Sequence, residues 1–142
     1  MDIGMANPNK LFPLIMTNKL DETREYYLDK LGCQAVYDMD NYLQVRFGSD
    51  DDGPELAFMN PCAMPGGETS FPIFDGRGVI ISIPTEDADR RHAELQEKKV
   101  ALGGEPENKP WGWRSFHAPD PNGVLLDFFH VLEQAAVADA TG

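Results

Sequence analysis

The 142-residue chain is short of cysteine, histidine and basic residues, and these shortages exclude several classes of protein. Its two cysteines, Cys33 and Cys62, cannot form a disulfide framework and lack the Cys-x-x-Cys spacing of a metal site, so we expect both to be reduced and structural. No apolar run reaches the roughly 20 residues that span a bilayer, and the N-terminus lacks the basic and apolar segments of a secretion signal. The sequence therefore predicts a soluble, cytoplasmic protein.

Positive charge is scarce as well. The chain has 12 Lys and Arg against 24 Asp and Glu, a formal net charge of −12. Such a surface repels phosphate backbones, which excludes nucleic-acid binding as a main function. The acidic balance either serves solubility alone or attracts a cationic ligand, and the sequence leaves both readings open.

The order strand, helix and three strands occurs twice along the chain, and 42% hydrophobic residues are enough for the core of one domain. Residues 11 to 16 are typical of a buried strand, and Asn18 can cap a helix that Gly32 ends. Three strands are expected next, at residues 34 to 38, 42 to 48 and 55 to 60. They complete a first module over residues 11 to 60.

A proline- and glycine-rich connection, residues 61 to 76, leads to a second module over residues 77 to 133. That module opens with a strand at residues 79 to 84. Thr85 then precedes the acidic start of a helix with an apolar stripe of Ala88, His92 and Leu95. A short strand is expected at residues 100 to 102 or 105 to 107, before a closing hairpin. The Ala-rich residues 134 to 142 should form a flexible tail.

The closing hairpin is the most informative segment. Asp120-Pro121-Asn122-Gly123 has the composition of a tight turn, because Pro fixes φ while Asn and Gly tolerate positive φ. With a two-residue turn Asp127 would lie opposite Phe116. A turn one residue longer or shorter would place Asp127 on the face of Trp113 and His117. The sequence does not decide between these registers.

The hairpin resembles the closing hairpin of the glyoxalase/bleomycin-resistance/extradiol-dioxygenase superfamily, the vicinal oxygen chelate proteins. Its members carry a Pro-Trp-Gly-x-Arg-x-Phe strand followed by Asp-Pro-x-Gly, as residues 110 to 123 do here. Residues 17 to 32 look like the family's strand-to-helix opening, which ends in Tyr-x-x-x-Leu-Gly. The resemblance covers nearly the whole chain. It implies an α+β fold of two βαβββ modules that form a curled mixed β-sheet cleft, and a homodimer. The apolar residues Val124-Leu125-Leu126 and Phe128-Phe129 also favour a homodimer.

The resemblance further implies where a metal would bind. The four ligand positions of the family's metalloenzymes correspond here to Phe12, Glu55, Val79 and Asp127. Two of the four carry no donor atom, and two carboxylates alone suit zinc, nickel or ferrous iron poorly. A one-residue error in the first or fifth strand brings in no ligand either, since the neighbours are Leu11, Pro13, Gly78 and Ile80. We therefore predict no metal and no other cofactor.

Candidate catalytic residues are few. His117 ends the tryptophan-bearing strand, where it can act as a donor or base or can simply cap the hairpin. Glu55 and Asp127 could form an acid–base pair if burial raised the pKa of one of them.

The ligand-binding candidates centre on the two tryptophans, which share one face of their strand. They are either core or dimer contacts or a stacking wall for a flat or cationic ligand. The full set of ligand-binding candidates is Trp111, Trp113, Arg114, Phe12, Glu55 and Asp127.

These features favour a metal-free protein that resembles the bleomycin-resistance branch and sequesters an aromatic or cationic small molecule. The alternative is a glyoxalase- or dioxygenase-type enzyme, a lyase or oxidoreductase with an atypical or metal-independent site. A third hypothesis is a purely structural or interaction module. A ligand-sized cavity lined by Trp would favour a binding protein, and a bound metal would favour an enzyme. A filled cavity would favour the structural or interaction module.

The first prediction concerns the metal. Elemental analysis of the purified protein should find no stoichiometric zinc, nickel or iron, because Phe12 and Val79 stand where donors would be needed. About one metal per chain, lost on substitution of Glu55 or Asp127, would contradict this reading.

Overall fold

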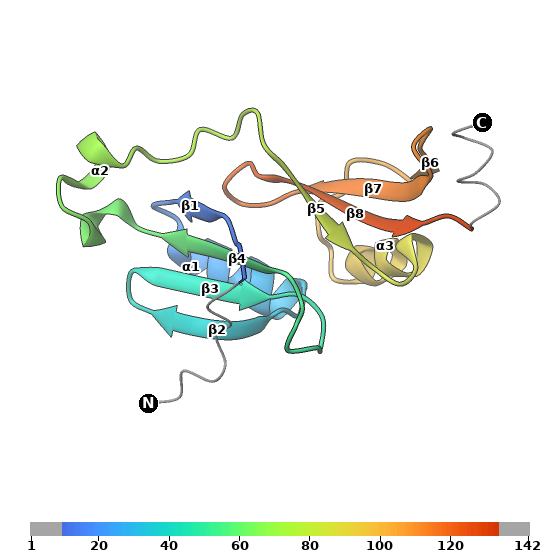
Figure 1. Ribbon diagram of the computed structural model, residues 1–142, viewed down its shortest axis with the longest axis horizontal. Coiled ribbons are helices and arrows are strands. Elements are labelled where there is room, and N and C mark those ends of the chain that lie inside the picture. Colours follow the sequence, from blue (N-terminus) through green and yellow to red (C-terminus); the bar gives the residue numbers. More distant parts are fainter. Residues whose placement is uncertain (1–9, 134–142) are drawn as a thin grey trace. The chain divides into compact units, whose positions relative to one another are not determined.

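The computed structural model describes residues 10 to 133, which divide into two compact units between Arg77 and Gly78. Each unit contains one four-stranded mixed sheet and repeats the order strand, helix and three strands (Figure 1). The predicted α+β fold of two βαβββ modules is thus confirmed. No helix among the described residues is long and apolar enough to cross a membrane. The prediction of a tail at residues 134 to 142 lies outside the described residues.

The first unit packs one helical segment against a sheet of order β1-β4-β3-β2, in which β1 runs parallel to β4. The strands are β1 (Leu14–Met16), β2 (Gln34–Met39), β3 (Tyr42–Arg46) and β4 (Glu55–Met59). The helical segment begins as α1 (Leu20–Arg24) and continues as a π-helical turn, η2 (Glu25–Lys30). Figure 1 shows it against one face of this sheet.

The predicted ends of the first strand and helix are correct only in part. The prediction that Asn18 caps the helix is wrong, because Lys19 holds the cap position and no side chain caps it. Gly32 ends the segment as predicted, with φ at +74°, where glycine is favoured. The first strand begins at Leu14 and not at residue 11, since Pro13 has no N–H to donate to the ladder.

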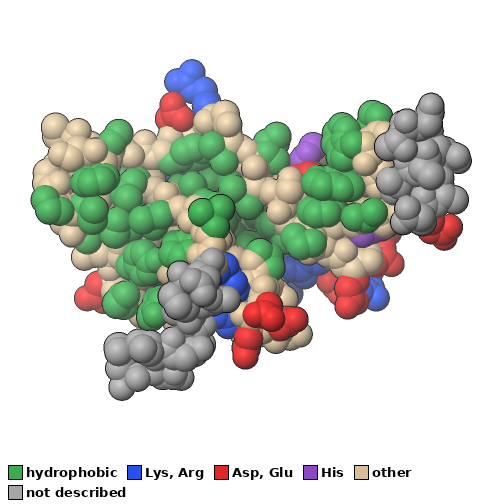
Figure 2. Space-filling model, in the orientation of Figure 1, with side chains coloured by type: hydrophobic (Ala, Val, Ile, Leu, Met, Phe, Trp, Pro, Cys, Tyr) green, Lys and Arg blue, Asp and Glu red, His purple; other side chains and the backbone are tan. Residues whose placement is uncertain are grey.

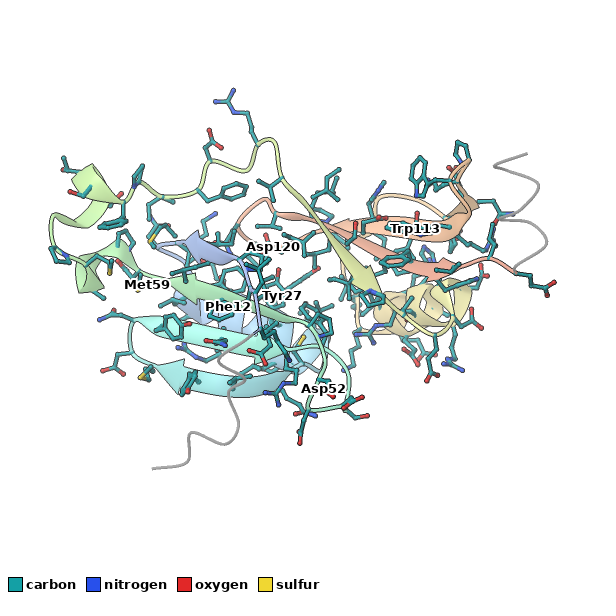
Figure 3. The ribbon with its side chains drawn as sticks, viewed as in Figure 1. Phe12, Tyr27, Asp52, Met59, Trp113 and Asp120 are labelled. Carbon is teal, nitrogen blue, oxygen red and sulfur yellow. The ribbon has the colours of Figure 1, made fainter. Side chains whose placement is uncertain are left out.

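The core of the first unit lies between the helical segment and the sheet. Tyr27 is fully buried, with its ring centroid 4.9 Å from that of Phe58 and 6.2 Å from that of Phe47 (Figure 3). Because side chains alternate along a strand, Phe58 on the helix side places Glu55, Ala57 and Met59 on the opposite face. We call this opposite face the helix-distal face of the first sheet.

The segment predicted to be an irregular connection contains two short helical turns, η3 (Pro61–Ala63) and α2 (Gly67–Ser70). The Asn60 side chain accepts the Cys62 N–H at 2.9 Å and Pro61 occupies the first turn, which explains why η3 forms here. The Phe74 N–H donates to the Met16 carbonyl at 3.0 Å, so the end of this segment is fixed beside β1.

The second unit has the sheet order β5-β8-β7-β6 and one helix. Its elements are β5 (Ile80–Pro84), α3 (Ala88–Glu97), β6 (Glu107–Asn108), β7 (Trp113–Pro119) and β8 (Leu125–Val131). Strand β5 runs parallel to β8, as β1 does to β4 in the first unit. The short strand lies at Glu107–Asn108, which overlaps the second of its two predicted positions by one residue.

Helix α3 packs its predicted stripe against the second sheet. Ala88, His92 and Leu95 are all buried, and the His92 ring meets the Phe116 ring edge-on at 5.0 Å. The N-cap is Asp87, whose carboxylate accepts the N–H groups of residues 89 and 90 at 3.0 and 3.2 Å. Phe116 therefore marks the helix side of the second sheet.

Candidate functional site

The turn between β7 and β8 decides which side chains share a face. Asp120 Oδ1 accepts the N–H groups of Asn122 and Val124, both at 2.8 Å, and the Asp120 N–H donates to the Val124 carbonyl at 2.9 Å. Three residues therefore lie between this closing pair, and Gly123 takes a φ of +83°. The turn therefore has three residues, one more than the two-residue turn that would pair Asp127 with Phe116. Asp127 pairs with His117 across the hairpin.

This register gathers the candidate residues of the second unit on one face. Since Phe116 faces α3, its neighbours Ser115 and His117 point to the other side, which we call the helix-distal face of the second sheet. Trp113 shares this face by alternation. Asp127 joins them as the partner of His117 across the hairpin.

An aromatic wall, made of Trp111, Trp113 and Phe129, lies at one end of this face. The Trp113 and Phe129 rings stack with centroids 3.7 Å apart and planes 10° apart. Trp111 meets Trp113 edge-on at 6.3 Å and is 60% exposed, because it lies in the tight turn before β7. Figure 2 shows hydrophobic side chains gathered over β7 and β8, and Figure 3 places Trp113 on β7. Both tryptophan side chains are therefore only partly buried in the core of this unit.

Asp127 lies further along the same face and is 6% exposed. Its Oδ2 accepts the Ser82 hydroxyl at 3.3 Å, and His117 Nε2 lies 3.4 Å from its Oδ1. Within the described residues, Asp127 Oδ1 and the buried Ser115 Oγ make no hydrogen bond. Ser82 is bound to the carboxylate and not to the imidazole, so these three residues do not form a nucleophilic Ser–His–Asp relay.

Arg114 lies on the other face, toward α3. Its Nε and one terminal nitrogen donate to the two carboxylate oxygens of Asp89 at 2.9 and 3.0 Å, and its second terminal nitrogen donates to Asn108 at 3.0 Å. The hydrogen bonds from Arg114 hold the pKa of Asp89 below its usual value, against the effect of burial. Arg114 therefore links β7 to α3 and lies on the face opposite Trp113 and Asp127.

In the first unit, Glu55 is the centre of a buried polar network. Its Oε1 accepts Gln44 Nε2 at 2.6 Å, and its Oε2 accepts Arg46 Nε at 3.1 Å and Lys10 Nζ at 3.1 Å. Tyr42 extends the network by donating to Gln44 at 2.5 Å. Arg46 is 2% exposed and Glu55 is 6% exposed, so this ion pair is removed from water, while Lys10 is only half-buried.

The network holds Glu55 in its ionised form. Burial acts to raise the pKa of Glu55, but hydrogen bonds from Gln44, Lys10 and Arg46, together with the charge of Lys10, hold it below its usual value. The pKa of Tyr42 is raised by burial and by its neighbours Tyr37 and Glu55. A carboxylate in this state is poorly suited to act as a general acid or base near neutral pH.

The remaining candidates, Phe12 and Val79, lie at the entrances to their strands. Phe12 is half-buried before β1, and Val79 is 38% exposed before β5. The side chain that β5 places beside Asp127 is Ser82, its partner in the parallel ladder. The sequence alone does not predict Ser82 as a site residue, because only the register of β5 against β8 brings it beside Asp127.

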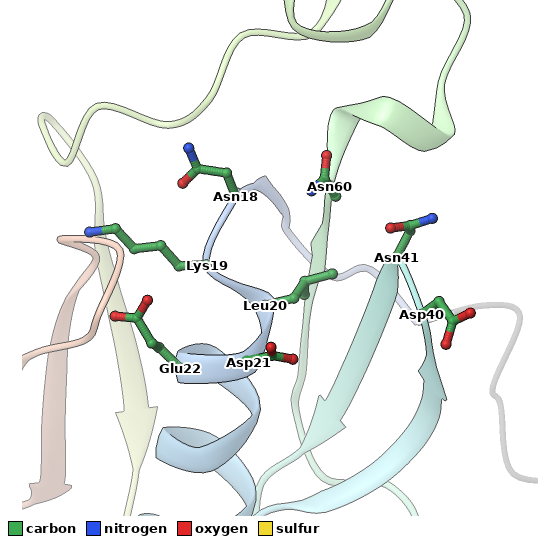
Figure 4. Close-up of a pocket in the computed structure, with 8 residues that line it drawn as sticks. All are labelled: Asn18, Lys19, Leu20, Asp21, Glu22, Asp40, Asn41 and Asn60. Atoms are coloured by element: carbon green, nitrogen blue, oxygen red, sulfur yellow. The ribbon is translucent and has the colours of Figure 1, made fainter.

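A separate polar pocket of about 260 Å³ lies at one end of the first unit (Figure 4). It is lined by Asn18, Lys19, Leu20, Asp21, Glu22, Asp40, Asn41 and Asn60. Several of these groups already have partners: Asp21 pairs with Arg24 at 3.0 Å, and Asn60 caps η3. The pocket contains none of the residues predicted to be catalytic or ligand-binding.

Comparison with known proteins agrees with this architecture. The sequence profile of the Glyoxalase/Bleomycin resistance protein/Dioxygenase superfamily matches residues 11–128. The chain belongs to this superfamily. No curated protein matches it significantly.

Solved structures of the superfamily share the fold over most of their length. A glyoxalase/bleomycin resistance protein/dioxygenase from Nocardioides is 22% identical, with a TM-score of 0.71 over 91% of this chain and 87% of its own. TnmS3, an antibiotic binding protein from Streptomyces sp. CB03234, is 25% identical, with a TM-score of 0.65 over 89% and 98%. A lactoylglutathione lyase from Agrobacterium tumefaciens is 15% identical, with a TM-score of 0.64 over 88% and 96%. The superfamily thus includes both binding proteins and enzymes.

The residues of this chain do not fit the metal of the superfamily's enzymes. Both oxygens of Glu55 already accept hydrogen bonds from cations and an amide. Phe12 and Val79 offer no donor. Among residues 10 to 133 no group of three His, Cys, Asp or Glu side chains is arranged to hold a metal ion.

The second prediction follows from the Glu55 network. Glu55→Gln removes the anion between Lys10 and Arg46 and should lower the free energy of unfolding by about 3 kcal/mol near pH 7. Because the folded pKa lies below the ordinary value of 4.5, the stabilisation is complete above that value and is lost as pH falls through the folded pKa. The difference between wild type and variant should therefore shrink in acid.

Urea unfolding at about pH 7, 5 and 3 measures this difference. Glu68→Gln, at an exposed position in α2, removes the same charge and should change stability little. A Glu55→Gln variant as stable as wild type near pH 7, or a difference that grows in acid, would contradict the network.

Proposed function

We propose that the protein binds a planar aromatic or cationic small molecule on the helix-distal face of its second sheet, without a metal and without transforming it. One observation carries the proposal: a partly exposed Trp113–Phe129 stack and the buried carboxylate of Asp127 occupy the same face. An aromatic surface and a fixed anion together suit a flat ligand with positive charge.

The energies involved are moderate, so several contacts must act together. An aromatic pair contributes about 0.5 to 1.5 kcal/mol beyond its buried area, and a cation over an indole contributes about 0.5 to 2 kcal/mol. The net charge of −12 adds long-range attraction for a cation. Affinity therefore depends on burial of the ligand against the aromatic wall, with charge adding selectivity.

The relatives support binding more directly than catalysis. TnmS3, which is 25% identical over most of both chains, is an antibiotic binding protein. At 15% identity, the lactoylglutathione lyase shares the fold alone. We propose that this chain, too, sequesters its ligand, as proteins of the bleomycin-resistance branch do.

One observation favours an enzyme as the second candidate. His117 Nε2 lies 3.4 Å from Asp127 Oδ1, and a carboxylate beside an imidazole can orient it for proton transfer. A metal-independent glyoxalase- or dioxygenase-type reaction would use His117 as the base. Product analysis after long incubation with bound compounds separates the candidates, since a binding protein returns its ligand unchanged.

The third prediction uses the fact that the chain has only two tryptophans, both in the aromatic wall. A planar aromatic cation that binds should quench tryptophan fluorescence, and in Trp111→Phe the remaining signal comes from Trp113 alone. Trp113→Ala should weaken binding about tenfold, since it removes the stacked surface. Trp113→Phe should restore most of the affinity.

Calorimetric titration gives the affinities, and circular dichroism checks that each variant is folded. A screen in which no planar compound binds, or in which Trp113→Ala and Trp111→Ala both bind like wild type, would show that the wall is structural.

The fourth prediction is a cytoplasmic homodimer. Val124, Leu126 and Phe128 are buried in the core of the second unit, so the predicted apolar run is largely used within the unit. The dimer proposal rests instead on the edge strands and on two exposed side chains at the start of the edge strand β5, Val79 and Ile80. Sedimentation equilibrium at micromolar concentration should give twice the chain mass of 15.8 kDa, and a monomer would contradict it.

A further inference from the structure

The helix-distal face of the second sheet contains two buried polar groups without a hydrogen bond. Asp127 Oδ1 and Ser115 Oγ both lack a partner within the described residues, although Asp127 is 6% exposed and Ser115 is 1% exposed. Buried polar atoms are normally paired, because leaving one unpaired costs stability. Both atoms are covered in this structure, so a partner from outside the protein can complete them only once a neighbouring side chain, such as His117 beside Asp127, moves aside.

The protein's own groups do not fill this role. His117 Nε2 stays 3.4 Å from Asp127 Oδ1 without forming a hydrogen bond, and Ser82 reaches only the other oxygen, at 3.3 Å. No Lys or Arg side chain pairs with Asp127 among residues 10 to 133, since its one ion-pair contact is His117. The carboxylate therefore keeps an acceptor position for a donor.

Glu55 of the first unit shows what a structural carboxylate looks like in this fold. It also lies on the helix-distal face of the last strand of its unit, yet it accepts hydrogen bonds from Gln44, Arg46 and Lys10. The two units have the same topology, but both oxygens of Glu55 accept hydrogen bonds, whereas Oδ1 of Asp127 accepts none within the described residues. Stability alone accounts for Glu55 and leaves Asp127 unexplained.

We propose that Asp127 and Ser115 form the hydrogen-bonding half of the ligand site, and that they select a planar cationic N–H donor such as an aryl amidinium. An amidinium offers parallel N–H groups that match a carboxylate, and the Ser115 hydroxyl can donate to or accept from the same ligand. This inference rests on the proposed function, to which it adds the chemical class of the ligand.

The spacing along the strands sets the size of this ligand. Phe129 lies opposite Ser115 and two residues from Asp127, which is about 7 Å along a strand. A ligand whose aromatic ring lies beside the Trp113–Phe129 stack can therefore donate to Asp127 if its N–H group is about 7 Å from that ring. A naphthalene carrying an amidinium group has about this length.

The test compares 2-naphthamidine with its neutral isostere 2-naphthamide by calorimetry. Wild type should bind the amidine at least about tenfold more tightly, as a charge-assisted hydrogen bond implies. Asp127→Asn should abolish this preference and leave the affinity for the amide nearly unchanged, and Ser115→Ala should reduce the preference in part. Glu86→Gln, which removes the same charge from an exposed position outside the site, should keep the preference.

Stability supplies a second readout that needs no ligand. Asp127→Asn removes an incompletely paired buried charge, so the variant should be at least as stable to urea as wild type, in contrast to Glu55→Gln. A loss of stability comparable to that of Glu55→Gln would overturn the inference, because Asp127 would then be structural.

The binding outcomes separate this inference from the proposed function. If both compounds bind in a Trp113-dependent manner and Asp127→Asn keeps the amidine preference, the inference fails and the proposed function stands. If neither compound binds wild type, the inference fails, and the wider screen of planar compounds decides the proposed function. If Glu86→Gln loses the preference for the amidine as Asp127→Asn does, the preference arises from net charge, and the inference is overturned.

Discussion

The turn at Asp120 is the constraint on which the second unit depends. Its carboxylate holds two backbone N–H groups and fixes a turn of three residues. Had the turn been one residue shorter, Asp127 would face α3 with Phe116, since a slip of one residue turns every side chain of a strand to the other face. A local hydrogen-bond pattern thus places a carboxylate, an imidazole and the aromatic wall on one surface.

The two units show how one topology can be used for stability and for binding. In the first, the helix-distal face carries a saturated network in which Glu55 neutralises part of the charge of Lys10 and Arg46. In the second, the same face carries a carboxylate with an open acceptor position and a stack of two rings. This asymmetry is a physical reason to assign ligand binding to the second unit.

Much of the fold could be predicted from the sequence, because apolar alternation and glycine at helix ends are local signals. They predict Gly32 at the end of the first helical segment and the apolar stripe of α3. The prediction that Asn18 caps the helix is wrong, because composition does not determine backbone geometry at a helix start. The site was harder. Trp113, His117 and Asp127 could be named, but whether they share a face depended on the turn length. Lys10, Ser82 and Ser115 were missed, since partners distant in sequence meet only once the register is known.

A crystal structure of the protein with a bound aryl amidinium tests the central claim most directly. The account predicts the ring of the ligand against Trp113 and Phe129, with an amidinium nitrogen about 3 Å from Asp127 Oδ1. A ligand found instead in the polar pocket between Asn18 and Asn60, or against the Glu55 network of the first unit, would contradict it.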